Sequence, residues 1–449
     1  MPGPRATHRP PSAAHATLAP VVKRLANGVR LLALPLPQVQ SASVGVFLRV
    51  GSRDETPATS GISHVLEHMA FKGTTSRTVQ AINLDAERLG ADVNAFTSKD
   101  TTGYFMTGLG RHTEPLLRMT ADIVLHSTFP AVELARELEV IRQEAIEYAE
   151  DPQERASDLL DRALWGEQPM GMPVIGSLVN IERFTRQDLL RHVRAHHVAG
   201  NTVVAAAGNV DVPAFLALGE QLFGGMRAGR KRVVPPVAPP CHVGAALGQR
   251  FSQVSQVFMN LAWPLAPADR AAMAEPRWRV AGSLAAMVFG GGMSAPLTDT
   301  VRERLGLAYT AEASSEGGDA WFNFIVHAVT TPDKLAQLVQ ATGDLLGAHA
   351  RGFDPVHLER AKNQLTVSRV RSAERPYATM ERAVEELFTR GTVTAAADDI
   401  ALIDGITQEE VQAVFAKMLA RPPALAITGK GATHKAARET AQRLLAATR

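Results

Sequence analysis

Cysteine is almost absent from this sequence, and this limits the sites that the chain can build. Of its 449 residues, only Cys241 is a cysteine. One cysteine supports neither a disulfide framework nor a thiolate metal site. Any bound metal must therefore be held by histidine and carboxylate side chains, and the lack of disulfides fits a reducing compartment.

Long apolar runs and a strong net charge are also missing. No segment approaches the ~18 consecutive apolar residues of a transmembrane helix, so we expect no membrane span. The formal net charge is +2, which gives no electrostatic reason to expect nucleic acid or a membrane surface as a partner. The basic cluster at 227–232 precedes a predicted linker, and we interpret it as a solvated face.

Acidic residues are missing from the N-terminus, where the first one is Asp54. Acid-poor tails that contain arginine occur in organelle transit peptides, but the prolines of residues 1–19 disfavour the amphipathic helix of such peptides. The same residues lack the apolar core of a secretory signal. We therefore interpret 1–19 as a disordered tail and expect a cytoplasmic protein.

A proline-rich stretch divides the remaining chain into two parts of similar length. With 45% hydrophobic and 20% charged residues, the composition is that of a globular protein of two or three domains. The basic and proline-rich stretch predicts a linker over 228–243. We expect one domain at 20–227 and a second at 244–449.

Paired features indicate that the second domain repeats the first. Glu303-Arg-Leu-Gly306 repeats Glu87-Arg-Leu-Gly90, and Pro376 parallels Pro152. A predicted strand follows each Glu-Arg-Leu-Gly sequence, at 92–97 in the first domain. A duplicated α+β unit of about 200 residues accounts for these parallels.

A predicted helix in the first domain carries a candidate metal site. Thr59 and Ser60 offer N-cap oxygens to this helix, which contains His64, Glu67 and His68 in the inverzincin order H-x-x-E-H. On a helix, histidines four residues apart project from one face, as two ligands of one tetrahedral zinc ion require. The glutamate would then reach a metal-activated water without binding the metal. A surface helix with two histidines that bind nothing is the alternative.

The second domain provides an internal control for this alternative. Aligning the two copies places Gly282, Ala285 and Ala286 at the positions of the two histidines and the glutamate. Side chains needed only for packing had no reason to differ in this way. We therefore interpret the triplet of the first domain as chemical.

A zinc site with two histidines requires at least one further protein ligand. The predicted helix at 132–147 offers Glu137 and Glu144, which are seven residues apart and therefore lie on one face. Helix geometry alone does not choose between them or among the neighbouring glutamates, which are Glu133, Glu139, Glu147 and Glu150.

These features together resemble the pitrilysin-type zinc peptidases of family M16, over about residues 20–430. Residues 64–74, His-Val-Leu-Glu-His-Met-Ala-Phe-Lys-Gly-Thr, match the family signature, and 89–97, Leu-Gly-Ala-Asp-Val-Asn-Ala-Phe-Thr, match its edge-strand segment. The chain looks most like the single-unit branch, which includes the mitochondrial processing peptidase and bacterial relatives. The resemblance implies an α+β fold of two homologous domains, each an antiparallel-rich sheet packed with helices.

The resemblance also implies an activity and its residues. It implies a zinc-dependent metalloendopeptidase that cleaves peptides or unfolded segments inside a chamber, with one Zn²⁺ per chain. The family's third ligand lies about 76 residues after the second histidine, which corresponds to Glu144. By the same match Glu137 orients the site and Glu67 is the general base. Opposite Glu144, the second domain has Ser368.

Substrate binding and assembly follow from the same resemblance. Family members bind the substrate as an added strand at an exposed sheet edge, which implies a role for Asn94 and Ala95. Arg302 and Tyr309 match the family's paired substrate-binding arginine and tyrosine. Because the chain carries both this pair and the zinc residues, we expect a homodimer. A heterodimer with an inactive M16 partner is the alternative.

Two other functions are compatible with the fold. A non-catalytic subunit, like the core subunits of the respiratory bc1 complex, would keep the fold as a scaffold but would not need the four zinc-site residues. S-ribosylhomocysteine lyase shares the fold and an H-x-x-E-H site, but it relies on a cysteine. Here the one cysteine, Cys241, lies in the predicted linker.

Overall fold

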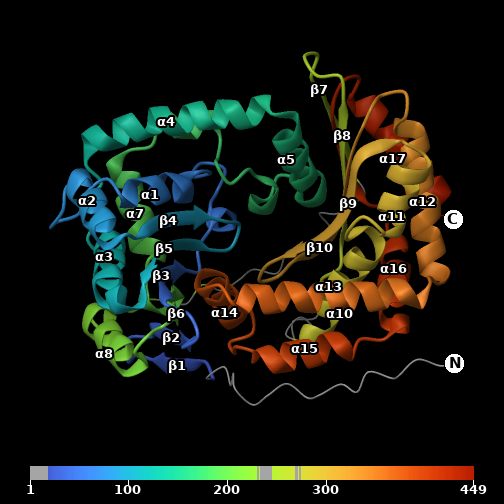
Figure 1. Cartoon of the computed structure of the whole chain (residues 1–449). Helices are drawn as coiled ribbons and strands as arrows, with labels where there is room; N and C mark the ends of the chain where they lie inside the picture. Colours follow the sequence, from blue (N-terminus) through green and yellow to red (C-terminus); the bar gives the residue numbers. More distant parts are fainter. Residues whose placement is uncertain (1–18, 230–231, 233–244, 268–271, 273–274, 449) are drawn as a thin grey trace, which may run out of the picture.

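A computed structural model shows the chain folded into two lobes (Figure 1). The structure describes all residues except 1–18, 230–231, 233–244, 268–271, 273–274 and 449. The predicted tail at 1–19 and the predicted linker at 228–243 therefore lie largely outside the described residues. Within the described part of the chain, no helix is both long enough and apolar enough to cross a bilayer.

The N-terminal lobe contains a six-stranded sheet in the order β1-β2-β6-β3-β5-β4. Strands β2 and β6 are parallel, and all other neighbours are antiparallel. The strands are β1 (Val21–Arg24), β2 (Arg30–Pro35), β3 (Ser41–Leu48), β4 (Asp92–Thr97), β5 (Thr102–Leu109) and β6 (Thr202–Gly208). The helices are α1 (Ile62–Ala70), α2 (Val79–Leu89), α3 (Thr113–Leu125), α4 (Ala131–Glu150), α5 (Pro152–Trp165), α6 (Leu178–Ile181), α7 (Arg186–His196) and α8 (Val212–Phe223).

Among its described residues, the C-terminal lobe repeats this topology with strands that correspond to β2 through β6. Its sheet has the order β7-β11-β8-β10-β9, in which only β7 and β11 are parallel. The strands are β7 (Ala246–Arg250), β8 (Val257–Pro264), β9 (Ala308–Gly317), β10 (Phe322–Thr330) and β11 (Ala424–Gly429). The helices are α10 (Pro276–Gly290), α11 (Pro296–Thr298), α12 (Leu335–Arg351), α13 (Pro355–Ala373), α14 (Pro376–Thr389), α15 (Ala396–Asp404), α16 (Gln408–Leu419) and α17 (His434–Ala447), with a π-helical turn η6 (Asp299–Arg304) after α11. The predicted α+β fold with two homologous sheets is confirmed.

The repeated Glu-Arg-Leu-Gly sequence has the same structural role in both lobes. Gly90 follows α2 and has φ 61°, and Gly306 follows η6 and has φ 57°. Both angles lie in the left-handed region, where glycine has no steric penalty. Each glycine thereby ends a helical segment and turns the chain into an edge strand, which is β4 in one lobe and β9 in the other.

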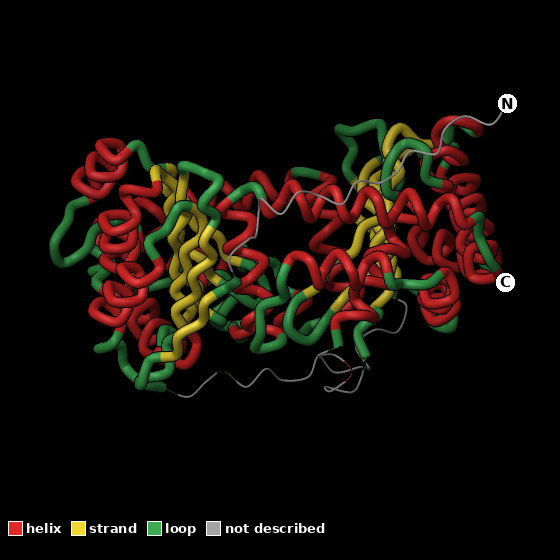
Figure 2. Tube along the Cα trace, turned by 60° about the horizontal axis from the view of Figure 1, so that its bottom comes forward, coloured by secondary structure: helices red, strands yellow, loops and turns green. Residues whose placement is uncertain are grey.

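One helix of each lobe packs against the sheet of the other lobe. Helix α5 packs its apolar side on β8 and β11, and α14 packs on β3 and β6. Both helices begin with a proline, Pro152 and Pro376, as the internal repeat predicts. Figure 2 shows the two sheets apart, with helices between them. The exchange joins the lobes through two hydrophobic cores.

The basic cluster at 227–232 is not uniformly solvated, which corrects the interpretation from the sequence. The side chain of Arg232 is buried and lies 2.6 Å from a carboxylate oxygen of Asp54 and 3.2 Å from one of Asp100. A guanidinium is buried at acceptable cost when carboxylates pair with it. Neither acidic residue is near Arg232 in the sequence, so the cluster alone did not indicate this burial.

Candidate metal centre

The motif helix α1 is amphipathic, with its two histidines and Glu67 outside the apolar core that its other side joins. Ile62, Val65, Leu66 and Met69 are buried in a core that α4 and α7 complete. The spacing of these four residues follows the helical period, so their burial fixes the rotation of α1 about its axis. The two histidines and Glu67 consequently lie outside this core, and both histidines face Glu144 of α4.

The start of α1 differs from the sequence prediction. The N-cap residue is Gly61, in the left-handed region with φ 98°, and neither Thr59 nor Ser60 caps the helix. Instead Glu55 accepts the backbone N–H of Gly61 over 2.7 Å and that of Ser63 over 2.9 Å. Burial raises the pKa of Glu55 to about 7, and these two N–H donors act in the opposite direction. The sequence analysis missed this residue because the cap comes from outside the helix.

His64, His68 and Glu144 converge, and Glu144 is the glutamate that the family resemblance implies. The Nε2 atoms of His64 and His68 lie 3.8 and 3.7 Å from the same Oε2 atom of Glu144. Within the described residues this is the only set of three histidine, cysteine or acidic side chains whose ligand atoms lie within 4.8 Å of one another. Ligand atoms of a tetrahedral zinc site with bonds of about 2.0–2.1 Å lie roughly 3.4 Å apart, so small shifts would complete a site.

The chemistry of these donors also fits zinc. The Oε2 atom of Glu144 is buried and has no hydrogen-bond partner among the described residues. A buried carboxylate oxygen without a partner is costly unless a cation satisfies it. Burial and the neighbouring His68 lower the pKa of His64 to about 4, which favours the neutral imidazole that binds metals.

Glu137 lies behind His68 and is itself held by a lysine. One Glu137 oxygen is 3.2 Å from Nδ1 of His68, and the other is 2.7 Å from Nζ of Lys72. A carboxylate at Nδ1 favours the tautomer in which Nε2 is free to bind a metal. Lys72 belongs to the quoted signature, but the sequence analysis gave it no role because its partner is 65 residues away.

Glu67 occupies a half-buried position between the histidines and the edge strand. Burial raises its pKa above the usual value, whereas the Thr97 hydroxyl and His68 lower it, and Glu144 raises it further. Thr97 is the last residue of β4. Glu67 therefore lies where the metal residues and the edge of the sheet meet.

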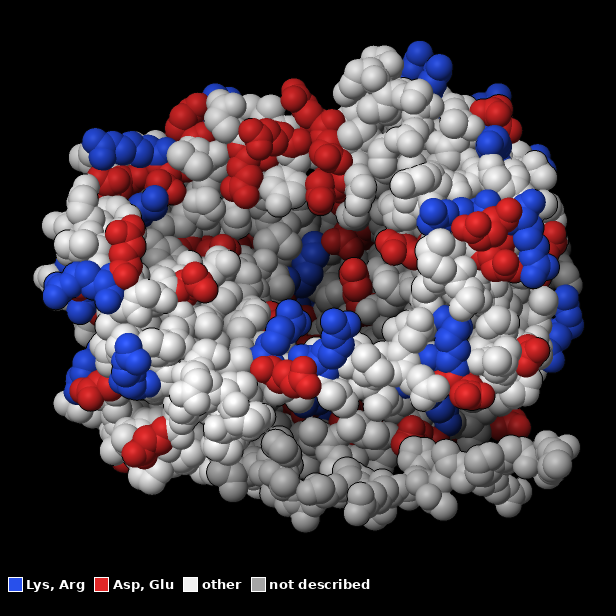
Figure 3. Space-filling model, in the orientation of Figure 1, with Lys and Arg blue, Asp and Glu red and all other residues white. Residues whose placement is uncertain are grey.

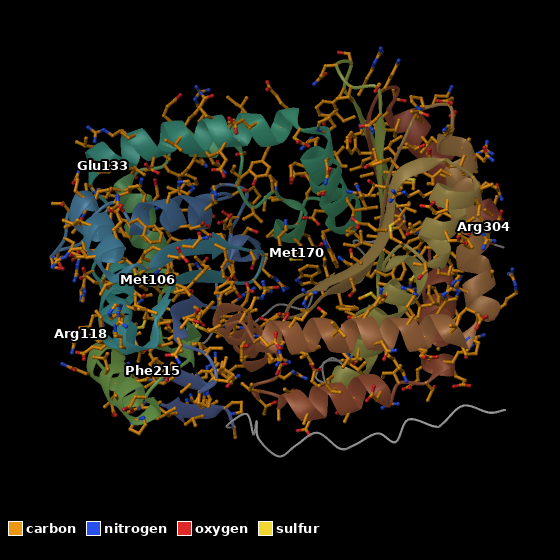
Figure 4. All side chains as sticks on the ribbon, viewed as in Figure 1. Met106, Arg118, Glu133, Met170, Phe215 and Arg304 are labelled. Atoms are coloured by element: carbon orange, nitrogen blue, oxygen red, sulfur yellow. The ribbon has the colours of Figure 1, made fainter. Side chains whose placement is uncertain are left out.

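The predicted substrate residues lie at two separate places. Asn94 and Ala95 are in β4, an edge strand whose outer side has no partner strand within the described residues. The guanidinium carbon of Arg302 lies 5.3 Å from the ring centre of Tyr309, and Tyr309 is 78% exposed. Figure 4 shows Arg304, two residues after Arg302, on the outer side of the C-terminal lobe, opposite the lobe that carries Glu133 and α1. The elements that carry this pair, η6 and β9, therefore belong to a different lobe from α1 and α4, which carry the candidate metal ligands.

The positions of α10 and α13 that correspond to the candidate metal ligands carry no metal-binding side chains. Gly282, Ala285 and Ala286 are buried on α10. A Cβ at Gly282 would lie 2.6 Å from the ring of Phe322, so close packing occupies the space that a histidine would need. Ser368 lies on α13, the counterpart of α4. The internal control from the sequence thus has a structural basis.

The sequence matches two family models along most of its length. Residues 31–177 match the model described as insulinase, peptidase family M16, and residues 183–365 match that of the peptidase M16 inactive domain. A curated relative from Mycobacterium tuberculosis, described as an uncharacterized zinc protease, is 32% identical over 423 residues. The aligned part covers 94% of this chain and 95% of that protein.

Solved structures share the fold over nearly the whole chain. A peptidase M16 inactive domain from Pseudomonas fluorescens superposes with a TM-score of 0.82 at 22% identity, covering 92% of this chain and 98% of that chain. A chain of complex III2 from Candida albicans superposes with a TM-score of 0.77 at 17% identity, covering 94% and 99%. The same architecture therefore occurs both in a peptidase M16 inactive domain and in a chain of a multisubunit complex.

Proposed function

The chain belongs to peptidase family M16, and from this premise we propose that it is a zinc-dependent metalloendopeptidase. His64, His68 and Glu144 would hold one zinc ion, and Glu137 would orient His68. The observation that carries the proposal is the convergence of two Nε2 atoms on the buried, unpaired Oε2 of Glu144. Glu67 lies on the same face of α1, within reach of what such a site would bind.

The reaction needs a proton carrier beside the scissile bond. When bound, zinc supplies Lewis-acid activation of a water molecule and of the peptide carbonyl. Glu67 takes the proton from the attacking water and gives it to the leaving amine. Partial burial raises its pKa toward neutrality, which suits a group that must both accept and release a proton.

The substrate would be an extended peptide paired with the free edge of β4. Backbone groups near Asn94 and Ala95 would form the ladder, which places a peptide bond near Glu67. A cavity of about 850 Å³ between the lobes is lined by Phe96 of β4 and by Trp321 and Phe322 across it. Figure 3 shows a hollow between the lobes, with acidic side chains gathered on the side of α4 and α5. Unfolded segments fit such a hollow better than folded proteins do.

A second copy of the chain would complete the chamber. Arg302 and Tyr309 stack together and belong to the lobe that lacks metal ligands, where Arg302 is partly exposed and Tyr309 is exposed. In a homodimer the pair of one subunit would face the zinc of the other subunit. In a heterodimer with an inactive M16 partner, the Arg302–Tyr309 pair of this chain would face a subunit without a zinc site.

A non-catalytic role as a structural or partner subunit is the second candidate. The likeness to a chain of complex III2 favours it at the level of the fold. The assembled donor set disfavours it, because a scaffold has no need of three converging ligands and a half-buried glutamate beside them.

Zinc content and peptide cleavage separate these candidates. The purified chain should hold about one zinc per chain and cleave an internally quenched peptide, and a chelator should abolish cleavage until zinc is restored. A chain without tight zinc binding at His64, His68 and Glu144 would be a scaffold. A zinc-loaded chain that releases homocysteine from its ribosyl conjugate, but cleaves no peptide, would be a lyase.

A further inference from the structure

We propose that Glu55 is a positioning residue for the metal centre and acts through the first turn of α1. The inference rests on the proposed zinc site. In this proposal Glu55 itself binds neither metal, substrate nor water. It is 3% exposed and lies nine residues before His64, in the loop that precedes α1.

The first turn of α1 is weakly stabilised by the residues of the helix itself. The helix has nine residues, and His64 is the third of them. The first N–H groups of a helix have no partner within the helix, so a short helix frays there unless a side chain caps it. The N-cap residue Gly61 has no side chain, and no side chain at the N-cap position accepts a hydrogen bond.

Glu55 supplies this cap with both of its oxygens. Oε2 accepts from the N–H of Gly61 over 2.7 Å, and Oε1 accepts from the N–H of Ser63 over 2.9 Å. The second donor immediately precedes His64. A carboxylate at this end is also favoured by the helix dipole. One side chain thus holds the backbone on both sides of the N-terminal residue Ile62.

The loop that carries Glu55 is itself fixed from another segment. Asn180 donates its side-chain N–H to the carbonyls of Pro57 over 2.8 Å and of Ser60 over 3.1 Å. Gly176 lies against Gly61 so closely that a Cβ at position 176 would be 2.4 Å from the Gly61 Cα. Glu55 therefore connects a rigid loop to the turn that carries the first metal ligand.

The consequence is specific to the metal site. His64 must stay within about 4 Å of Glu144, which is on a different helix, for both to bind one ion. Fraying of the first turn moves His64, whereas His68, Glu137 and the Asn94–Ala95 part of β4 lie outside that turn. Thr97, at the end of β4, contacts the turn by donating its hydroxyl to the Ser63 carbonyl over 3.4 Å. Loss of the cap should therefore lower zinc affinity and kcat, whereas KM should stay nearly constant because the proposed substrate strand is not part of α1.

The test compares Glu55→Gln and Glu55→Ala with a matched cap elsewhere. Asp211 caps α8 by accepting the N–H of Ala214 over 3.0 Å, and α8 carries no site residue. Zinc affinity is measured by chelator competition, stability by the melting temperature of the zinc-free protein, and kcat and KM at saturating zinc. We expect zinc affinity to fall by about tenfold or more in both Glu55 variants. In Asp211→Ala the melting temperature should fall by a similar amount as in the Glu55 variants, but zinc affinity should fall by less than about twofold.

Retention of charge provides a further check. Glu55→Asp keeps a carboxylate on a shorter side chain. Its zinc affinity should lie between those of Glu55→Ala and the unmodified chain. If Glu55→Ala does not fold, Glu55→Asp is compared with Glu55→Gln instead. Glu55 variants that lose melting temperature but keep the zinc affinity of the unmodified chain would overturn the inference. Two other results would contradict the proposed function and not this inference. One is that the unmodified chain does not bind zinc tightly, and the other is that the His64→Ala variant binds zinc as tightly as the unmodified chain.

Discussion

Trp321 donates its indole N–H to a carboxylate oxygen of Asp100 over 2.8 Å, which joins the tips of two equivalent β-hairpins. Asp100 lies between β4 and β5, and Trp321 immediately precedes β10. Asp100 also pairs with Arg53 and Arg232 at 2.9 and 3.2 Å. The contact with Trp321 attaches the hairpin that contains β4, the proposed substrate strand, to the C-terminal lobe.

Neutralising Asp100 should therefore destabilise the whole two-lobed unit. In Asp100→Asn, two buried guanidinium groups lose an ionic partner, and the free energy of unfolding should fall by about 3 kcal/mol in urea denaturation. Glu114→Gln is the matched control, because its pair with Arg118 is exposed at 65% and 42% of the two side chains. The control should change stability by less than about 0.5 kcal/mol. Equal effects of the two substitutions would show that the buried ion pairs of Asp100 do not stabilise the fold.

Glu144 and Glu137 should differ in their effect on zinc binding. Glu144→Gln removes a direct ligand and should abolish tight binding in metal titrations. Glu137→Gln only weakens the support of His68 and should reduce affinity by about 10–100-fold. A larger effect of Glu137→Gln than of Glu144→Gln would reverse the two assignments.

Mixing two inactive variants tests whether the site is shared between subunits. Glu67→Gln keeps the Arg302–Tyr309 pair, and the double variant Arg302→Ala, Tyr309→Phe keeps the general base. After subunit exchange at equal amounts, half of the dimers are mixed and each regains one intact site, so about a quarter of the unmodified activity should return. A fully active monomer, or no recovery in exchanged dimers, would exclude a site shared in trans.

A histidine cluster at the end of α7 should make the fold sensitive to acid. His192, His196 and His197 lie together, and burial with the neighbouring His196 lowers the pKa of His197 to about 3. Because the folded pKa is below the unfolded value of 6.5, the unfolded state binds more protons, and stability is lost as pH falls from 6.5 toward 3. Between pH 7 and pH 5, His197→Gln should lose about 1–2 kcal/mol less stability than the unmodified chain in urea denaturation. Identical pH dependence of the two proteins would refute this.

Local features of the chain could be predicted from the sequence because they depend on neighbouring residues. Strand β4 has the expected bounds, 92–97, and it begins two residues after Gly90, the glycine that ends α2. The two histidines of α1 share a face because a helix places residues four apart together. The proposed third ligand, Glu144, was predicted from the family resemblance, since helix geometry does not select one glutamate of α4.

Features that depend on distant residues could not be predicted in this way. An amphipathic helix shows which side is buried but not against what, so the exchange of α5 and α14 between lobes has no local signal. Arg232 looks solvated in the sequence because Asp54 and Asp100 reach it only after folding. Glu55 and Lys72 support the metal residues through contacts with segments that the H-x-x-E-H motif does not include.

The most direct measurement of the central claim is peptide cleavage by the zinc-loaded Glu67→Gln variant. The amide cannot take the proton of the attacking water, whereas His64, His68 and Glu144 are unchanged. The variant should bind one zinc per chain with the affinity of the unmodified protein, and its kcat on an internally quenched peptide should fall by more than about 10²-fold. Glu147→Gln, an exposed change three residues after Glu144, is the control and should keep full activity. Near-normal turnover by a zinc-loaded Glu67→Gln protein would contradict the account.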